Sequence, residues 1–197
     1  MTNADFAAKW DGPPMVVATD TALGASALTP ACRKFLGTVG LPSNALWFDS
    51  SSRAIMCFDS IACLRELCQA DVSPRVWSAV GPILPLTILG IHGSLFVVAD
   101  GRGRVLMVQS DTHSRVPADP DWSATVLVNH DVGRFASCLL AYKEVKELIR
   151  REEHDFRRPA VRNAVARFRA FLTSVDEGVM ADETSYWFQV VDHLDVW

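Results

Sequence analysis

The sequence predicts an α+β fold in which helices flank a central, mainly antiparallel sheet. The first observation is a β-hairpin pattern within residues 85–109. Two apolar runs, 95–99 and 105–108, flank the tetrad Asp100-Gly101-Arg102-Gly103, where glycines allow the positive φ angles of a tight turn. Because both runs are almost continuously apolar, the two strands should lie near the centre of the sheet. The second observation is the order of the other patterns, which does not alternate strand and helix as a doubly wound fold would.

The first third of the chain contains weak and strong signals. Residues 1–28, with Gly12-Pro13-Pro14, predict a loosely structured N-terminal arm, and residues 29–197 predict the folded domain. A helix should start at Thr29-Pro30, since threonine caps free amides and proline fits the first helical position. Residues 46–48 and 54–58 predict a first hairpin, and apolar spacing over 60–70 predicts an amphipathic helix.

The second half of the chain predicts one strand followed by helices. Residues 111–122, with two prolines and three acids, indicate an exposed loop, and 125–128 a short strand. Asn129 or Asp131 should then cap a long helix that reaches residue 149. Two further helices are expected, one with Val161, Val165, Phe168 and Leu172 on its apolar face and one over about residues 184–194.

Composition argues for an ordinary cytoplasmic protein. The net charge of −4 gives no general attraction to nucleic acid or to an anionic membrane. The N-terminus lacks a signal-peptide pattern, and no run approaches the roughly 18 apolar residues of a membrane span. An odd number of cysteines favours reduced thiols over a disulfide framework. They are Cys32, Cys57, Cys63, Cys68 and Cys138.

Charge is distributed unevenly toward the C-terminus. Residues 143–169 contain nine Lys or Arg and five Asp or Glu, whereas residues 176–197 contain six acids and no Lys or Arg. Mixed-sign helices are usually solvated faces, and the acids interspersed in the first segment would repel phosphates. Direct binding of nucleic acid is therefore not expected, and a basic partner would suit this chain better.

The residue types that could carry catalysis do not form a convincing site. The pair Cys63 and Cys68 would not converge on one face of the expected helix, which argues against zinc. Cys57 or Cys138 could in principle pair with His92 or His130, but both thiols sit in apolar runs where core packing is the simpler interpretation. Neither His92 between Gly90 and Gly93 nor the 100–103 turn has the pattern of a phosphate-binding loop. We expect no metal and no cofactor.

The ordered set of short motifs resembles the SUKH superfamily of Smi/Knr-like bacterial immunity proteins, and in particular its fourth subfamily. The matching positions include Phe35-Leu36, Gly40-Leu41-Pro42, Trp47-Phe48, Leu89-Gly90, residues 96–100, Gly103-Arg104-Val105, Val128-Asn129, Phe135, Leu139-Leu140 and Tyr142, with Trp187 a match to a late tryptophan. The resemblance covers about residues 29–149. It implies an α+β fold and a non-enzymatic protein that binds and neutralises a cognate polymorphic toxin, often a nuclease or deaminase, by occlusion in the producing cell's cytoplasm.

Contact residues cannot be carried over from such a family, so the candidates come from exposed acids and aromatics. They are Asp119, Asp121 and Trp122 in one loop, with Asp182, Glu183 and Tyr186 as a second patch. Two other interpretations stay open. One is a regulatory or scaffold module of the same fold, since fold does not fix function. The other is a small thiol hydrolase that uses Cys57 or Cys138.

Overall fold

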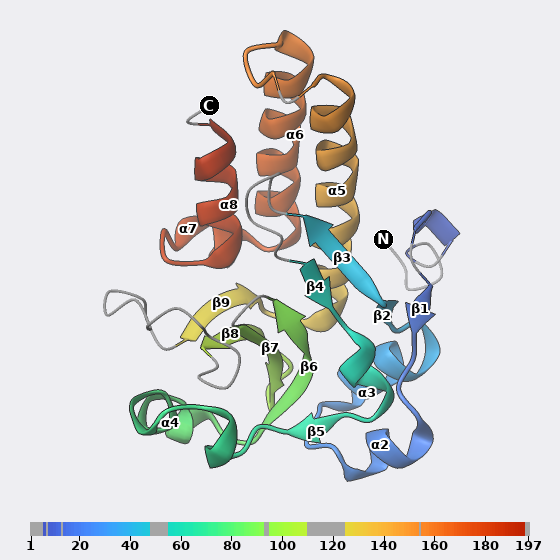
Figure 1. Ribbon diagram of the computed structural model, residues 1–197, viewed down its shortest axis with the longest axis vertical. Helices are drawn as coiled ribbons and strands as arrows, with labels where there is room; N and C mark the ends of the chain where they lie inside the picture. Colours follow the sequence, from blue (N-terminus) through green and yellow to red (C-terminus); the bar gives the residue numbers. More distant parts are fainter. Residues whose placement is uncertain are drawn as a thin grey trace.

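The computed structural model describes residues 6, 8–12, 14–47, 55–92, 95–109, 125–153 and 155–195. A twisted antiparallel sheet forms the middle of the protein, and a helical bundle rises from one side of it (Figure 1). The fold is α+β, as the sequence predicts.

The main sheet has seven strands in the order β3-β4-β6-β7-β8-β9, and β5 pairs with β6 off this path. Every pairing is antiparallel. The strands are β3 (Asn44–Trp47), β4 (Ile55–Cys57), β5 (Arg65–Glu66), β6 (Leu86–His92), β7 (Leu95–Asp100), β8 (Val105–Gln109) and β9 (Thr125–Asn129).

The predicted central hairpin is confirmed as β7 and β8, which have neighbours on both sides in the sheet. Its turn is held by Asp100, whose carboxylate accepts hydrogen bonds from the backbone N–H groups of Arg102 and Arg104 and from the Arg104 Nε, at 2.7–2.9 Å. Gly103 has φ +87°, a conformation that favours glycine. The turn therefore closes without strain and without exposing the buried carboxylate.

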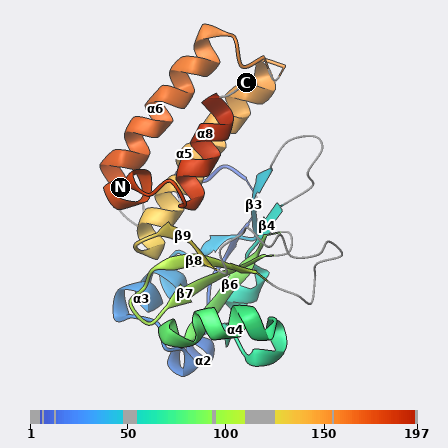
Figure 2. The ribbon, with the colours of Figure 1, turned by 90° about the vertical axis from the view of Figure 1, so that its left-hand side faces the viewer.

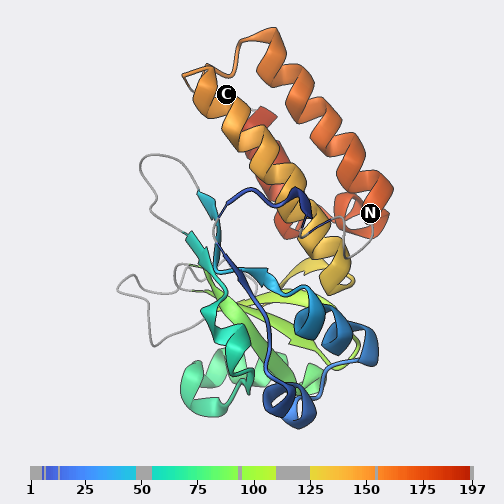
Figure 3. The same cartoon turned by 90° about the vertical axis from the view of Figure 1, so that its right-hand side faces the viewer.

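Both faces of the sheet are covered, which explains the nearly continuous apolar runs. One face packs on α4 (Pro74–Val80) and the loops beside it, through side chains such as Phe96, Val98 and Leu106. The opposite face carries the larger core, against α3 (Pro30–Thr38) and the helical bundle. Figures 2 and 3 show the bundle above the sheet and α4 below it.

Side-chain caps fix where the two best-predicted helices start. Thr29 accepts a hydrogen bond from the Cys32 amide at the start of α3, and Asp131 accepts one from the Arg134 amide at the start of α5. Asp131, rather than Asn129, is therefore the cap. The bundle consists of α5 (Val132–Arg151), α6 (Pro159–Val175), α7 (Glu177–Ala181) and α8 (Tyr186–Asp195).

In the N-terminal segment, the described residues include one short strand and one short helix. β1 (Met15–Val16) pairs with β2 (Leu41–Pro42), and α2 (Asp20–Ala25) follows. Phe6, 1% exposed, packs its ring on Trp10 and Phe35. Aromatic burial, rather than a periodic pattern, ties this segment to the main core.

The prediction of an amphipathic helix over residues 60–70 is wrong. The segment folds as η1 (Asp59–Ala62), strand β5 and η2 (Gln69–Asp71), and a further 3₁₀ turn, η3 (Gly81–Ile83), follows α4. Leu64 has φ +31°, and Leu67 then donates its amide to the Leu86 carbonyl at the edge of β6. Pairing with the sheet overrides the helical spacing of the apolar residues.

Candidate functional site

A buried polar network joins the end of β9 to the late helices, and Asp176 lies at its centre. The carboxylate of Asp176, 2% exposed, accepts hydrogen bonds from Asn129 Nδ2 at 3.1 Å and from the His130 amide at 2.9 Å. Its other oxygen lies 2.6 Å from His130 Nδ1. Burial raises the pKa of Asp176, but the hydrogen bonds from His130 and Asn129 outweigh burial and hold the pKa below its usual value.

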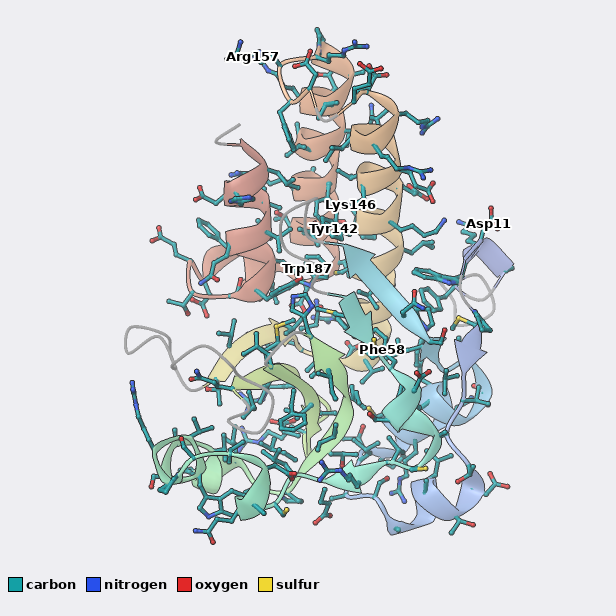
Figure 4. The ribbon with its side chains drawn as sticks, viewed as in Figure 1. Asp11, Phe58, Tyr142, Lys146, Arg157 and Trp187 are labelled. Atoms are coloured by element: carbon teal, nitrogen blue, oxygen red, sulfur yellow. The ribbon has the colours of Figure 1, made fainter. Side chains whose placement is uncertain are left out.

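Trp187 extends the network into the bundle. Its indole Nε1 donates to Asn129 Oδ1 at 2.8 Å, and the side chain is fully buried. The rings of Tyr142, Phe168 and Tyr186 surround the indole at centroid distances of 5.7, 5.9 and 5.0 Å. In Figure 4, Trp187 and Tyr142 lie at the base of the bundle, just above the sheet. The indole therefore fixes where α8 sits.

His92 and Tyr186 meet in the same core, where strand β6 ends. Their rings pack edge to face at a centroid distance of 6.2 Å, and His92 is 8% exposed. Burial lowers the pKa of His92 to about 4. The interpretation of His92 as part of a strand agrees with its place at the end of β6, which has a register shift between Ile88 and Gly90.

An acidic surface covers the late helices and the turn between them. Glu177, Glu183 and Asp192 are exposed, and Asp182 is partly exposed. We call these four residues the α7–α8 acidic surface. Hydrogen bonds from the Thr184 hydroxyl and amide lower the pKa of Asp182, so its carboxylate stays charged well into the acidic range. The surface presents negative charge on a fixed scaffold.

Tyr186 does not belong to this surface. The sequence places it beside Asp182 and Glu183, but its side chain is 6% exposed and packs on His92 and Trp187. Helical periodicity turns position 186 inward, along with Val190 and Val191. Tyr186 is therefore a core residue and is not available as a contact on the acidic surface.

The first predicted patch, Asp119, Asp121 and Trp122, lies outside the described residues. The strands that flank it fix where the connection begins and ends. β8 ends at Gln109 and β9 starts at Thr125. Both lie at the same end of the sheet as the end of β3, the start of β4, the end of β6 and the start of β7. The β3–β4, β6–β7 and β8–β9 connections therefore all leave the sheet at this end.

The geometry does not support thiol catalysis at the cysteines named from the sequence. Cys138 is fully buried, and burial raises the pKa of its thiol to about 12, the opposite of what a nucleophile needs. Cys57 was expected in the core but is exposed. Because Met56 is the register partner of His92, Cys57 projects to the other face of the sheet from His92.

The pair Cys63 and Cys68 forms no metal site. Both thiols are exposed, and Cys68 Sγ donates to Asp71 at 3.2 Å, while Arg65 holds the same carboxylate through two hydrogen bonds. Within the described ranges, no three His, Cys, Asp or Glu side chains gather as a metal ion requires. Among those same residues, no helix is both long and apolar enough to cross a membrane.

The sheet, the buried network and the late helices define an α+β protein with a cluster of acidic side chains on α7, α8 and the turn between them. The model of one protein family, described as SUKH-4 immunity protein, matches residues 3–193, which is nearly the whole chain. The chain therefore belongs to the SUKH-4 immunity protein family, and its function is immunity toward a cognate toxin. Searches of curated proteins and of solved structures found no match.

The sequence does not predict this network, although three of its members, Asn129, His130 and Trp187, are named among the residues of interest. Asn129 and Trp187 stand among the positions that carry the family resemblance, yet only the fold brings them together across 58 residues. In the sequence, Asp176 is one of six acids in residues 176–197 and carries no other signal. A single aspartate that follows an amphipathic helix gives no sign in sequence that it is buried.

Proposed function

We propose that this protein neutralises a nucleic-acid-targeting toxin by binding it stoichiometrically and covering its working surface. The observation that carries the proposal is the α7–α8 acidic surface, in a stretch, 176–195, that contains no Lys or Arg. Enzymes that act on nucleic acid bind phosphates through basic surfaces. An acidic partner competes for such a surface and is steered to it by complementary potential.

Asp182 and Glu183 are the proposed contacts on this surface. Asp119, Asp121 and Trp122 are the proposed contacts on the connection from β8 to β9, where a tryptophan would supply the apolar anchor that charges alone lack. Charged contacts of this kind set the association rate and the choice of partner, whereas a buried aromatic ring slows dissociation.

The proposed mechanism needs binding and no turnover. The protein would act without a cofactor, without direct contact to nucleic acid and away from membranes. We place it in the cytoplasm of the cell that makes the toxin, because a toxin with an internal target must be met there. The exposed free thiols of Cys57, Cys63 and Cys68 suit that reducing compartment.

Reversing two charges tests the proposed surface. The double variant Asp182→Lys/Glu183→Lys is expected to weaken binding to the cognate toxin by at least about 100-fold, or about 2.7 kcal/mol, because like charges would then face each other. Binding is measured by calorimetry with a catalytically inactive toxin. The matched control, Glu66→Lys/Glu144→Lys, makes the same change in net charge on β5 and α5 and is expected to stay within about twofold.

The other patch is tested in the same assay with Trp122→Ala and with Asp119→Lys/Asp121→Lys. Each is expected to weaken binding more than the control does. The proposed surface is refuted if both double reversals bind like the wild type, or if the control loses as much affinity as they do.

A further inference from the structure

His130 lies where the main sheet meets the late helices. It follows strand β9 and precedes α5, and its side chain is 42% exposed. Its ring lies directly against the backbone of Gly178 in α7, since a Cβ atom on that glycine would come within 2.8 Å of the imidazole Cε1. The residue before Gly178 is Glu177, which belongs to the α7–α8 acidic surface. His130 therefore borders this surface, although it comes from a different part of the chain.

The contact with Asp176 determines which ring nitrogen of His130 carries the proton. Asp176 Oδ1 lies 2.6 Å from His130 Nδ1. Although burial raises the pKa of Asp176, the hydrogen bonds that it accepts keep this pKa below its usual value, so the carboxylate is ionised and can only accept. Nδ1 therefore donates, and in the neutral imidazole Nε2 keeps a free lone pair. The His130 amide also donates to Asp176, which holds the backbone and the ring together.

The nitrogen Nε2 lies on the exposed edge of the ring. Nδ1 and Cε1 face the buried carboxylate and Gly178, so the exposed part of the side chain is the opposite edge, which contains Nε2. In the part of the chain that the structure describes, no other group forms a hydrogen bond with this ring. His130 therefore presents a hydrogen-bond acceptor outward, in an orientation that a buried carboxylate fixes from beneath.

The charges around the ring favour a cationic donor. The charged groups that contact or neighbour it are Asp131, Arg134, Asp176 and Glu177. Arg134 is itself engaged by Asp131 and Asp176, at 2.9 and 3.4 Å. Three carboxylates and one guanidinium give a negative local potential around a neutral imidazole. A lysine or arginine of a partner is therefore attracted to this position, and an acidic group is repelled.

We propose that His130 is a specificity-determining residue of the toxin interface, where its Nε2 accepts a hydrogen bond from a lysine or arginine side chain of the toxin. This role rests on the proposed function and extends the contact surface from α7 onto the turn between β9 and α5. A partner without a donor at this position leaves Nε2 covered and unpaired, which costs binding free energy. His130 thereby distinguishes the cognate toxin from other basic proteins, which the acidic surface alone attracts without discrimination.

Two replacements of His130 separate an interface role from a structural one. The asparagine amide reaches the position of Nδ1 but not that of Nε2, so His130→Asn keeps a donor toward Asp176 and loses the outward acceptor. The glutamine amide reaches the position of Nε2, so His130→Gln restores an outward oxygen and loses the bond to Asp176. Toxin affinity and stability should therefore rank the two variants in opposite order.

Calorimetry with a catalytically inactive cognate toxin measures the affinity. His130→Asn is expected to bind at least about 10-fold more weakly than the wild type, because a hydrogen bond to a charged donor is lost, and His130→Gln within about threefold of it. Urea unfolding should show His130→Asn to be the more stable of the two variants. The control Asn163→Ala removes an exposed amide from α6 and should bind within about twofold of the wild type.

Nitrogen NMR of the imidazole in the free protein checks the position of the proton without toxin. At about pH 8, His130 is expected to carry its proton on Nδ1, and addition of toxin should shift the Nε2 resonance. A proton on Nε2, or a His130→Asn variant that binds as tightly as the wild type, would overturn the role of His130 and leave stoichiometric neutralisation standing. Affinity that falls in step with stability in both variants would also overturn it. A wild-type protein that does not bind the toxin would refute the proposed function as well.

Discussion

Replacing Trp187 with alanine is expected to lower the free energy of unfolding by about 4 kcal/mol. The indole is fully buried, contacts three other aromatic rings and donates a hydrogen bond to Asn129. Alanine removes the packing of the indole and leaves a cavity. It also leaves the side-chain oxygen Oδ1 of Asn129 buried without the indole donor. The loss is measured as a change in the midpoint of urea unfolding at constant slope.

Two further variants separate the contribution of the indole hydrogen bond from that of aromatic packing and provide a control on the same helix. Trp187→Phe keeps most of the aromatic packing but removes the N–H donor, so a loss of about 2 kcal/mol is expected. Gln189→Ala, on the exposed side of the same helix, should change stability by less than about 0.5 kcal/mol. A Trp187→Ala variant as stable as Gln189→Ala would show that α8 is not held by the indole.

Acidification is expected to destabilise the fold by about 3 kcal/mol through His92 alone. Burial against Tyr186 lowers the pKa of His92 from 6.5 to about 4 in the folded state. Below pH 6.5 the unfolded chain gains a proton that the folded chain does not bind. Stability is therefore complete above pH 6.5, falls as the pH drops toward 4, and reaches its full loss below 4.

A neutral replacement isolates this effect from the carboxylates. Asp176 also loses its stabilising contribution in acid, because the folded state lowers its pKa. His92→Gln removes only the histidine term, so its unfolding free energy should change much less than that of the wild type between pH 6.5 and pH 4. Parallel pH profiles for the two proteins would contradict the assignment to His92.

Local rules predicted the parts of the fold that local interactions determine. The β7–β8 hairpin follows from apolar runs around a glycine turn, and the caps at Thr29 and Asp131 start their helices as expected. The helix prediction for residues 60–70 is wrong because a long-range interaction determines the structure there. There, two residues of β5 pair with β6, and this tertiary pairing outweighs a helical spacing of apolar side chains.

The candidate site was predictable only in part. The exposure of Glu183 and the partial exposure of Asp182 follow from composition and from their place before the last helix. The burial of Tyr186 depends on the direction that α8 takes over the sheet, which a short apolar pattern does not specify. The Asp176 network depends on contacts across 46 to 58 residues, so no local signal contains it.

Titration of purified toxin activity with this protein tests stoichiometric neutralisation most directly. At a toxin concentration far above the dissociation constant, activity is expected to fall linearly and to vanish at one equivalent of the wild-type protein. With the Asp182→Lys/Glu183→Lys variant, toxin activity should fall gradually and should vanish only at higher concentrations of the variant. Complete inactivation by a small fraction of an equivalent would mean turnover and would contradict neutralisation by occlusion, as would full toxin activity in the presence of excess protein.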